Sequence, residues 1–192
     1  MHHRHSATQW LLPIVIAVGM SACSATTQQP VPVTDGHRTI AEGYSLLYGI
    51  TSQQKDLKKL LYVKFESDAV DAMITEIADY AREVSAQLED MTRRYPALTV
   101  DKQFLPVVEV KTREAIAQET TAEFTSTKGK HFERRLLLKQ LSALEQEKNM
   151  AKVMVTLETA DERRAFWRKT QQRFETLHGK VWRLLSEQYF SK

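Results

Sequence analysis

The sequence predicts an all-α protein whose helices pack as a bundle. Between residues 39 and 188, apolar residues recur at steps of three and four, the spacing that places them on one face of a helix. No alternating apolar and polar stretch bounded by turn residues is long enough to predict a sheet. The 192-residue chain has only 6 Gly and 5 Pro, and its 42% hydrophobic and 27% charged residues are the balance of a folded domain.

The first 22 residues differ from this helical region. A polar start, Met1 to His5, precedes an apolar run from Trp10 to Met20. A bilayer core of about 30 Å requires roughly 20 apolar residues in a helix, whereas this run is shorter and contains Pro13. The pattern is typical of a secretory signal peptide covering residues 1–22.

The cysteine that follows is the only one in the chain, so no internal disulfide can use it. The stretch Met20-Ser21-Ala22-Cys23 resembles the bacterial lipobox, in which a bulky aliphatic residue and two small ones precede a cysteine that becomes lipidated. It departs from the usual pattern at Met20, where Leu is common. The resemblance implies lipid on the Cys23 sulfur and cleavage before Cys23. The alternatives are an uncleaved anchor helix over residues 10–22 or an incidental cysteine.

Such lipidation implies a place in the cell envelope, because two or more acyl chains hold a protein stably on a membrane. Ser24 after the cysteine, instead of Asp, resembles lipoproteins that are sent to the outer membrane and face the periplasm. Membrane lipid is then a partner through the acyl anchor, and no cofactor is expected beyond this covalent lipid. Residues 23–38 include Pro30 and Pro32 and show no helical period, which predicts a flexible tether.

The helical domain is predicted to cover residues 39–190. Thr39 and Glu42 form a capping-box pattern, which predicts a first helix from Thr39 to about residue 64. A second helix is predicted from Ser67 or Asp68 to just before Pro96, on the cleanest apolar stripe in the chain.

Residues 95–105 read as a linker, and Pro106 suits the first turn of a third, shorter helix with a thin apolar face. A fourth helix is predicted after residues 128–130. Thr159 and Glu162 repeat the capping-box pattern and predict a fifth helix that reaches about Gln188.

Four helices of about 25 residues, each about 37 Å long, can enclose one core while the third segment bridges two of them. The expected architecture is an antiparallel four-helix bundle with a shorter bridging helix. This layout, over residues 39–188, resembles the ferritin-like helical domains of unknown function found in exported bacterial proteins.

Ferritin-like metal proteins use two Glu-x-x-His repeats together with carboxylates on all four helices. Glu175 and His178 match one repeat, and no second repeat occurs in the long helices. A metal-binding or redox bundle that uses Glu175 and His178 is therefore kept as the alternative function. A surface pair or a contact within the helix explains the same two residues.

The predicted bridging helix contains a second candidate group. Glu109 and Arg113 are four residues apart, which predicts a structural ion pair, and a buried Arg113 would tie this helix to the main bundle. Glu119, Glu123 and His131 form either an open polar patch or an ordinary solvated surface.

The sequence lacks the common enzyme motifs. It contains no Gly-x-Ser-x-Gly, no His-Glu-x-x-His and no glycine-rich phosphate loop, so an enzyme is not expected. The formal charge of +3 comes from mixed basic and acidic residues and does not favour nucleic-acid binding. We therefore expect a membrane-anchored envelope lipoprotein with a non-enzymatic binding or structural domain, whose envelope protein partner is unknown. A ligand cavity between helices is a third possibility.

Overall fold

The computed structural model describes residues 35–61, 67–98, 100 and 106–190; the predicted signal peptide, Cys23 and most of the predicted tether lie outside them. Within these ranges all regular secondary structure is helical, which confirms the all-α prediction. The elements are α1 (Asp35–Gln54), α2 (Lys58–Leu61), α3 (Asp68–Arg94), α4 (Val107–Ser126), α5 (Gly129–Leu157), α6 (Asp161–Leu185) and the π-helical turn η2 (Ser186–Phe190).

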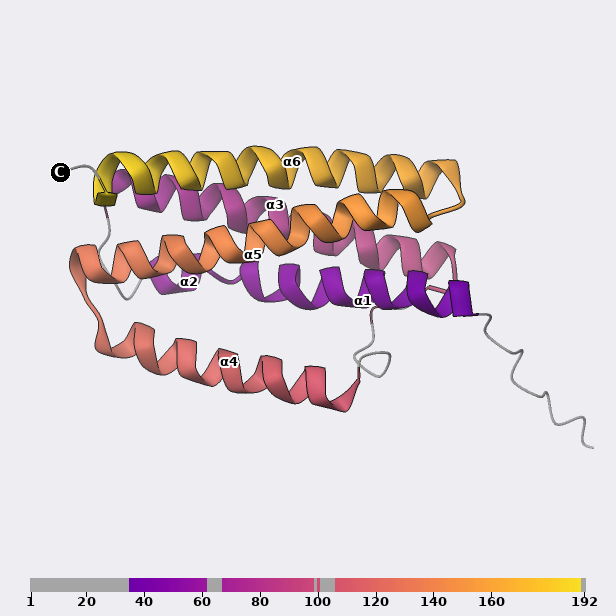
Figure 1. Ribbon diagram of the computed structural model, residues 1–192, viewed down its shortest axis with the longest axis horizontal. Helices are drawn as coiled ribbons and strands as arrows, with labels where there is room; N and C mark the ends of the chain where they lie inside the picture. Colours follow the sequence, from indigo (N-terminus) through magenta and orange to yellow (C-terminus); the bar gives the residue numbers. More distant parts are fainter. Residues whose placement is uncertain (1–34, 62–66, 99, 101–105, 191–192) are drawn as a thin grey trace, which may run out of the picture. The chain divides into compact units, whose positions relative to one another are not determined.

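The long helices pack against one another in pairs. The most extensive pairing joins α5 to α6, and α1 packs on both α3 and α5, while α3 also contacts α6 (Figure 1). Helix α4 lies beside α1 and α5 (Figure 1). Residues of all three helices line one cavity. None of the helices in the described ranges is both long enough and apolar enough to cross a bilayer.

The core forms where the apolar stripes predicted from the sequence meet. In α3, Val70, Ile74 and Ile77 are buried at the spacing of one helical face. Complete burial of such a side chain contributes about 1.5–3 kcal/mol. Aromatic residues join the helices edge to face: the ring centroids of Tyr44 and Trp167 are 5.1 Å apart. The largest fully enclosed side chains include Trp167, Tyr44, Phe132, Phe174, Leu47, Ile74, Ile77 and Leu88.

The first predicted helix differs from the observed one at both ends. α1 begins at Asp35, so Thr39 lies inside the helix and not at its N-cap, and Arg38 Nε donates a hydrogen bond to Glu42 Oε1 at 3.0 Å. The helix stops at Gln54, where the amide of Leu57 bonds the Gln54 carbonyl at 3.0 Å and tightens the chain into a turn before α2. The ladder of backbone hydrogen bonds therefore breaks inside the predicted helix.

Helix α4 buries much less of its surface than the long helices. Phe124 is its one buried residue, whereas Val107 and Val108 are 76% and 74% exposed. The apolar residues of α4 are distributed around the helix and do not form one wide stripe, so the helix has no face that can be fully buried. The sequence predicts a thin apolar face for this helix, in agreement with its low burial.

A glycine allows α1 and α5 to approach closely. Gly43 is buried, and a Cβ placed there would overlap Sδ of Met154, which is itself almost fully buried on α5. A methyl group at this position requires the Met154 side chain to move within a packed core. The missing side chain at residue 43 therefore sets the separation of these two helices.

We expect Gly43→Ala to lower stability by about 0–2 kcal/mol, because displacement of the Met154 side chain costs about 1–3 kcal/mol and the higher helix propensity of Ala returns about 1 kcal/mol. Gly179→Ala is the matched control, since a Cβ at Gly179 in α6 meets no atom within 4 Å. The control should become more stable by about 1 kcal/mol. Urea unfolding measures both, and equal stability gains in the two variants would contradict the close contact.

Candidate functional site

A groove of about 1330 Å³ separates α4 from α1 and α5. Ile50 of α1 and Leu57 in the following turn line one part of it, and Phe132 and Ala143 of α5 line another. Small-molecule sites usually measure about 300–1,000 Å³, so the groove has room for an extended ligand. It exists because α4 lacks the apolar stripe that would let it pack directly on the bundle.

Threonines contribute much of the α4 wall of the groove. Three of them donate a hydrogen bond to a carbonyl four residues earlier: Thr112 to Val108 and Thr121 to Ala117, both at 2.8 Å, and Thr125 to Thr121 at 2.7 Å. Because these hydroxyl protons already have an acceptor within the helix, removing water from the side chains costs less than for free hydroxyls. The wall is more apolar than its sequence indicates.

The two ends of the groove are fixed by different contacts. Phe124 and Phe132 meet edge to face at 5.3 Å between ring centroids, where the end of α4 approaches the start of α5. Toward the other end, Arg113 Nε donates to Glu109 Oε1 at 2.6 Å, and a Cβ placed at Gly49 of α1 would lie 3.9 Å from Arg113 Nη1. The ion pair of Glu109 and Arg113 therefore lies in the groove lining, with the guanidinium close to α1.

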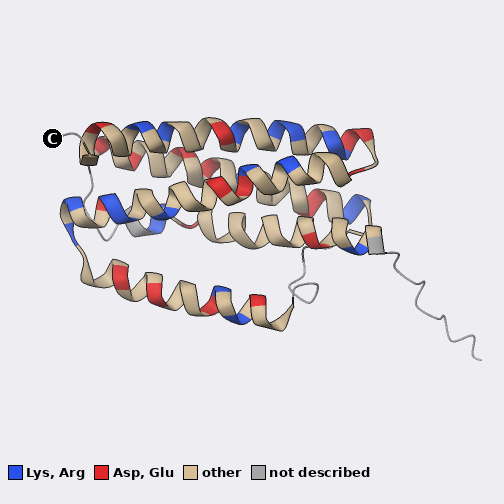
Figure 2. Cartoon of the chain, viewed as in Figure 1, with Lys and Arg blue, Asp and Glu red and all other residues tan. Residues whose placement is uncertain are grey.

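A second hollow, of about 550 Å³, adjoins the groove along α5, and the two share Lys139 and Ser142 in their linings. Arg134 and Arg135 also line the hollow; Arg135 forms an ion pair with Glu123, and the Arg134 guanidinium lies 5.3 Å from the centre of the Phe190 ring. Figure 2 shows basic residues gathered over the first turns of α5. With three cationic side chains and one carboxylate in its lining, the hollow is positively charged.

The structure assigns the three predicted polar-patch residues to both cavities. Glu119 lines the groove, whereas Glu123 and His131 line the adjoining hollow. Glu119 and His131 are exposed, which is compatible with an open polar patch and with an ordinary solvated surface.

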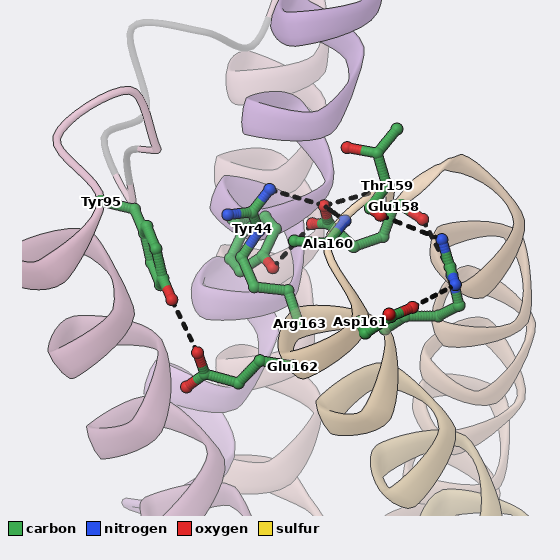
Figure 3. Close-up of polar contacts among 9 residues, drawn as sticks. Tyr44, Tyr95, Glu158, Thr159, Ala160, Asp161, Glu162 and Arg163 are labelled. Atoms are coloured by element: carbon green, nitrogen blue, oxygen red, sulfur yellow. Dashed lines mark hydrogen bonds and ion pairs between the residues drawn. The ribbon is translucent and has the colours of Figure 1, made fainter.

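A buried carboxylate holds the turn between α5 and α6 (Figure 3). Glu158 Oε1 accepts hydrogen bonds from the amides of Thr159 and Ala160 at 3.0 and 3.3 Å and from Arg163 Nη2 at 2.7 Å, while Tyr44 Oη donates to Oε2 at 3.0 Å. Burial alone raises the pKa of Glu158, but these donors outweigh it and hold the pKa below its ordinary value. Glu158, and not the predicted capping box of Thr159, organises the start of α6.

The end of α3 is attached to the same turn. Tyr95 Oη donates to Glu162 Oε2 at 2.7 Å (Figure 3), and Arg94 Nη1 donates to Glu162 Oε1 at 2.5 Å. The Arg163 guanidinium lies 4.8 Å from the centre of the Tyr95 ring, a cation–π contact. Each charged group here is engaged with a neighbouring helix or with backbone, so the cluster fits a structural clamp better than a catalytic site.

A second buried carboxyl, Glu147, lies in the centre of the helices. Gln54 Nε2 of α1 donates to Glu147 Oε2 at 3.3 Å and to Gln140 Oε1 at 3.4 Å, and in the described part of the chain Glu147 Oε1 has no hydrogen-bond partner. Burial raises the pKa of Glu147 well above its ordinary value, and the Gln54 hydrogen bond lowers it only in part. Among the described residues, the amide of Gln54 is the group that donates a hydrogen bond to this carboxyl.

The alternative metal pair is not joined by further ligands in the described residues. Glu175 is exposed and His178 is half-buried on α6. Burial and the charge of Lys148 lower the pKa of His178, against the opposing effect of Glu145 and Glu175. Among residues 35–61, 67–98, 100 and 106–190, no group of three or more His, Cys, Asp or Glu side chains could hold a metal ion.

Comparison of the chain with models of protein families, with curated proteins and with solved structures finds no match.

The apolar pattern of α5 indicates the burial of Glu147, which was not predicted. Glu147 follows Leu144 by three residues and precedes Ala151 by four, so it occupies a position on the buried stripe of α5. The groove has no comparable signal, because it depends on the distance between α4 and the bundle.

We expect Glu147→Gln to stabilise the protein increasingly as pH rises. The raised pKa of the folded carboxyl means that, above the ordinary value near 4.5, the unfolded chain ionises while the folded protein must keep the proton. This difference lowers stability by about 1.4 kcal/mol per pH unit until the folded pKa is reached. The neutral amide introduced by Glu147→Gln removes this pH dependence of the stability.

Urea unfolding of both proteins between pH 5 and pH 9 measures the effect. The stability difference between Glu147→Gln and the unmodified protein should be smallest at pH 5 and grow with pH. A difference that is independent of pH would contradict a neutral Glu147.

Proposed function

We propose that this protein is a lipid-anchored component of the bacterial cell envelope whose helical domain binds another envelope component in the groove between α4, α1 and α5. The groove is the observation that supports a binding role, because a folded domain rarely leaves so large a groove between its own helices. In this proposal residues 1–22 are removed as a signal peptide, and Cys23 carries the lipid at the outer membrane, facing the periplasm.

The proposal includes a specific helix arrangement. The helices α1, α3, α5 and α6 form an antiparallel four-helix bundle with a ferritin-like layout, and α4 is the bridging helix between the two hairpins. The pairwise packing of these four helices and the short turn between α5 and α6 support it. A bridging helix that does not complete the core is free to serve as one wall of a binding site.

The exposed apolar residues of α4 support a binding role. Ile116 lines the groove and is 51% exposed, and Val107 and Val108 near the start of the helix are even more exposed. Apolar side chains that are exposed to water on a helix bordering the groove favour contact with a further molecule.

The anchor is tested by mass spectrometry of the native protein. We expect the mature chain to begin at Cys23 and to carry acyl chains, and Cys23→Ala to leave a non-acylated precursor that begins at Met1. A native protein that begins at Met1 or carries a free Cys23 thiol would remove the anchor from the proposal.

The groove is tested by photo-crosslinking in intact cells. A photoreactive amino acid at Ile116 should give a defined crosslinked product, because this side chain lines the groove. The same amino acid at Val153 of α5 is the control, since Val153 is 54% exposed and lies outside the groove lining. The Ile116 product should disappear when Ala143→Trp fills the groove; indistinguishable labelling from the two positions would contradict a binding groove.

A further inference from the structure

The groove and the hollow beside it have different chemistry, and their linings share Lys139 and Ser142. The groove is bordered by apolar side chains such as Ile50, Ile116 and Phe132 and by threonines, three of which donate their hydroxyl protons within α4. Its charged residues, among them Glu119 and Lys128, lie on the same walls. The hollow is bordered by cationic side chains. From these observations we infer that the two together bind one anionic phospholipid-type amphiphile, with an acyl chain in the groove and its phosphate in the hollow. This inference rests on the proposed binding role of the groove.

The groove is long enough for an acyl chain. Its lining on α4 extends from Glu109 to Thr125, about 24 Å of helix at a rise of 1.5 Å per residue. One acyl chain spans about half of a bilayer core of about 30 Å. A chain of this length therefore fits between Phe124 and the ion pair at the far end, and the groove volume leaves room for it to bend.

The charges around the groove favour a head group on the α5 side. Toward the start of α4 the charge of Arg113 is neutralised by Glu109 at 2.6 Å. In the hollow, Glu123 pairs with Arg135, which leaves the charges of Arg134 and Lys139 without a carboxylate in the hollow lining. A phosphate placed there meets the planar donor groups of arginine, which suit phosphate oxygens.

The connection between the two cavities determines how such a ligand lies. Lys139 and Ser142 belong to both linings, so they mark the place where an apolar chain passes into a charged head group. A ligand with one apolar part and one anionic part satisfies both cavities at once. A partner peptide would have to present acidic side chains beside an apolar face at the same separation, and the experiment distinguishes this occupant.

The test uses the full chain with Cys23→Ser, stripped of lipid, so that no acyl chain of its own can occupy the groove. The probe is a fluorescently labelled lyso-phosphatidylglycerol, which has one acyl chain and one anionic phosphate. We expect saturable binding with one probe per protein. Unlabelled lyso-phosphatidylcholine, which has a chain but no net charge, should displace the probe less effectively, and inorganic phosphate should not displace it.

Two pairs of variants separate the groove from the hollow. Ile116→Glu places a charge in the groove, and Val153→Glu places the same charge at a similarly exposed position elsewhere. Lys139→Glu reverses a charge at the junction, and Lys152→Glu does so farther along α5, outside both linings. Ile116→Glu and Lys139→Glu should each weaken binding by about tenfold or more, as expected for loss of a charged or apolar contact, and the controls should not.

All four positions are exposed, and circular dichroism verifies that each variant keeps its helix content. The inference is overturned if the chain with Cys23→Ser alone does not bind the probe, if Ile116→Glu and Lys139→Glu bind as their controls do, or if the chain binds only phosphatidylglycerol vesicles and no monomeric lipid. A protein crosslinked through Ile116 without any lipid binding would also overturn it, while leaving the proposed envelope function in place.

Discussion

The fold depends on a carboxylate enclosed at the turn between α5 and α6. Glu158 accepts hydrogen bonds from two amides of the turn, from Arg163 and from Tyr44 of α1, so one side chain joins three helices. A buried charge is tolerated only when its desolvation is offset by several well-placed donors, and here four of them supply that compensation. These hydrogen bonds hold this end of α5 beside α1 and α6, and the buried residues of the three helices belong to one hydrophobic core.

Helix α4 lies outside this arrangement. Its apolar residues do not form one face, so it cannot be buried as the long helices are, and Phe124 provides its main contact beside the start of α5. The same lack of a stripe leaves the groove open. The candidate binding site is thus a consequence of incomplete packing by one helix on an otherwise well-packed group.

Features that depend on residues close in the sequence could be predicted, and features that depend on contacts between distant residues could not. The helix over residues 68–94 could be predicted closely, because its stripe depends only on residues near in sequence. The break after Gln54 could not be predicted, since backbone hydrogen bonds of the following turn decide it. Glu147 and Glu158 have no local feature that distinguishes a buried acid from a surface one, apart from the place of Glu147 on the α5 stripe. The groove depends on helix separation, which periodicity does not encode.

The threonines of α4 have a further consequence. A wall made of leucine or valine would be strongly apolar in the absence of a guest and would promote aggregation of the empty protein. Thr112, Thr121 and Thr125 keep hydroxyl oxygens that can still accept hydrogen bonds from water, while their own protons remain bonded within the helix. The wall is therefore compatible with both a hydrated and a dehydrated surface, which the proposed binding role of the groove requires.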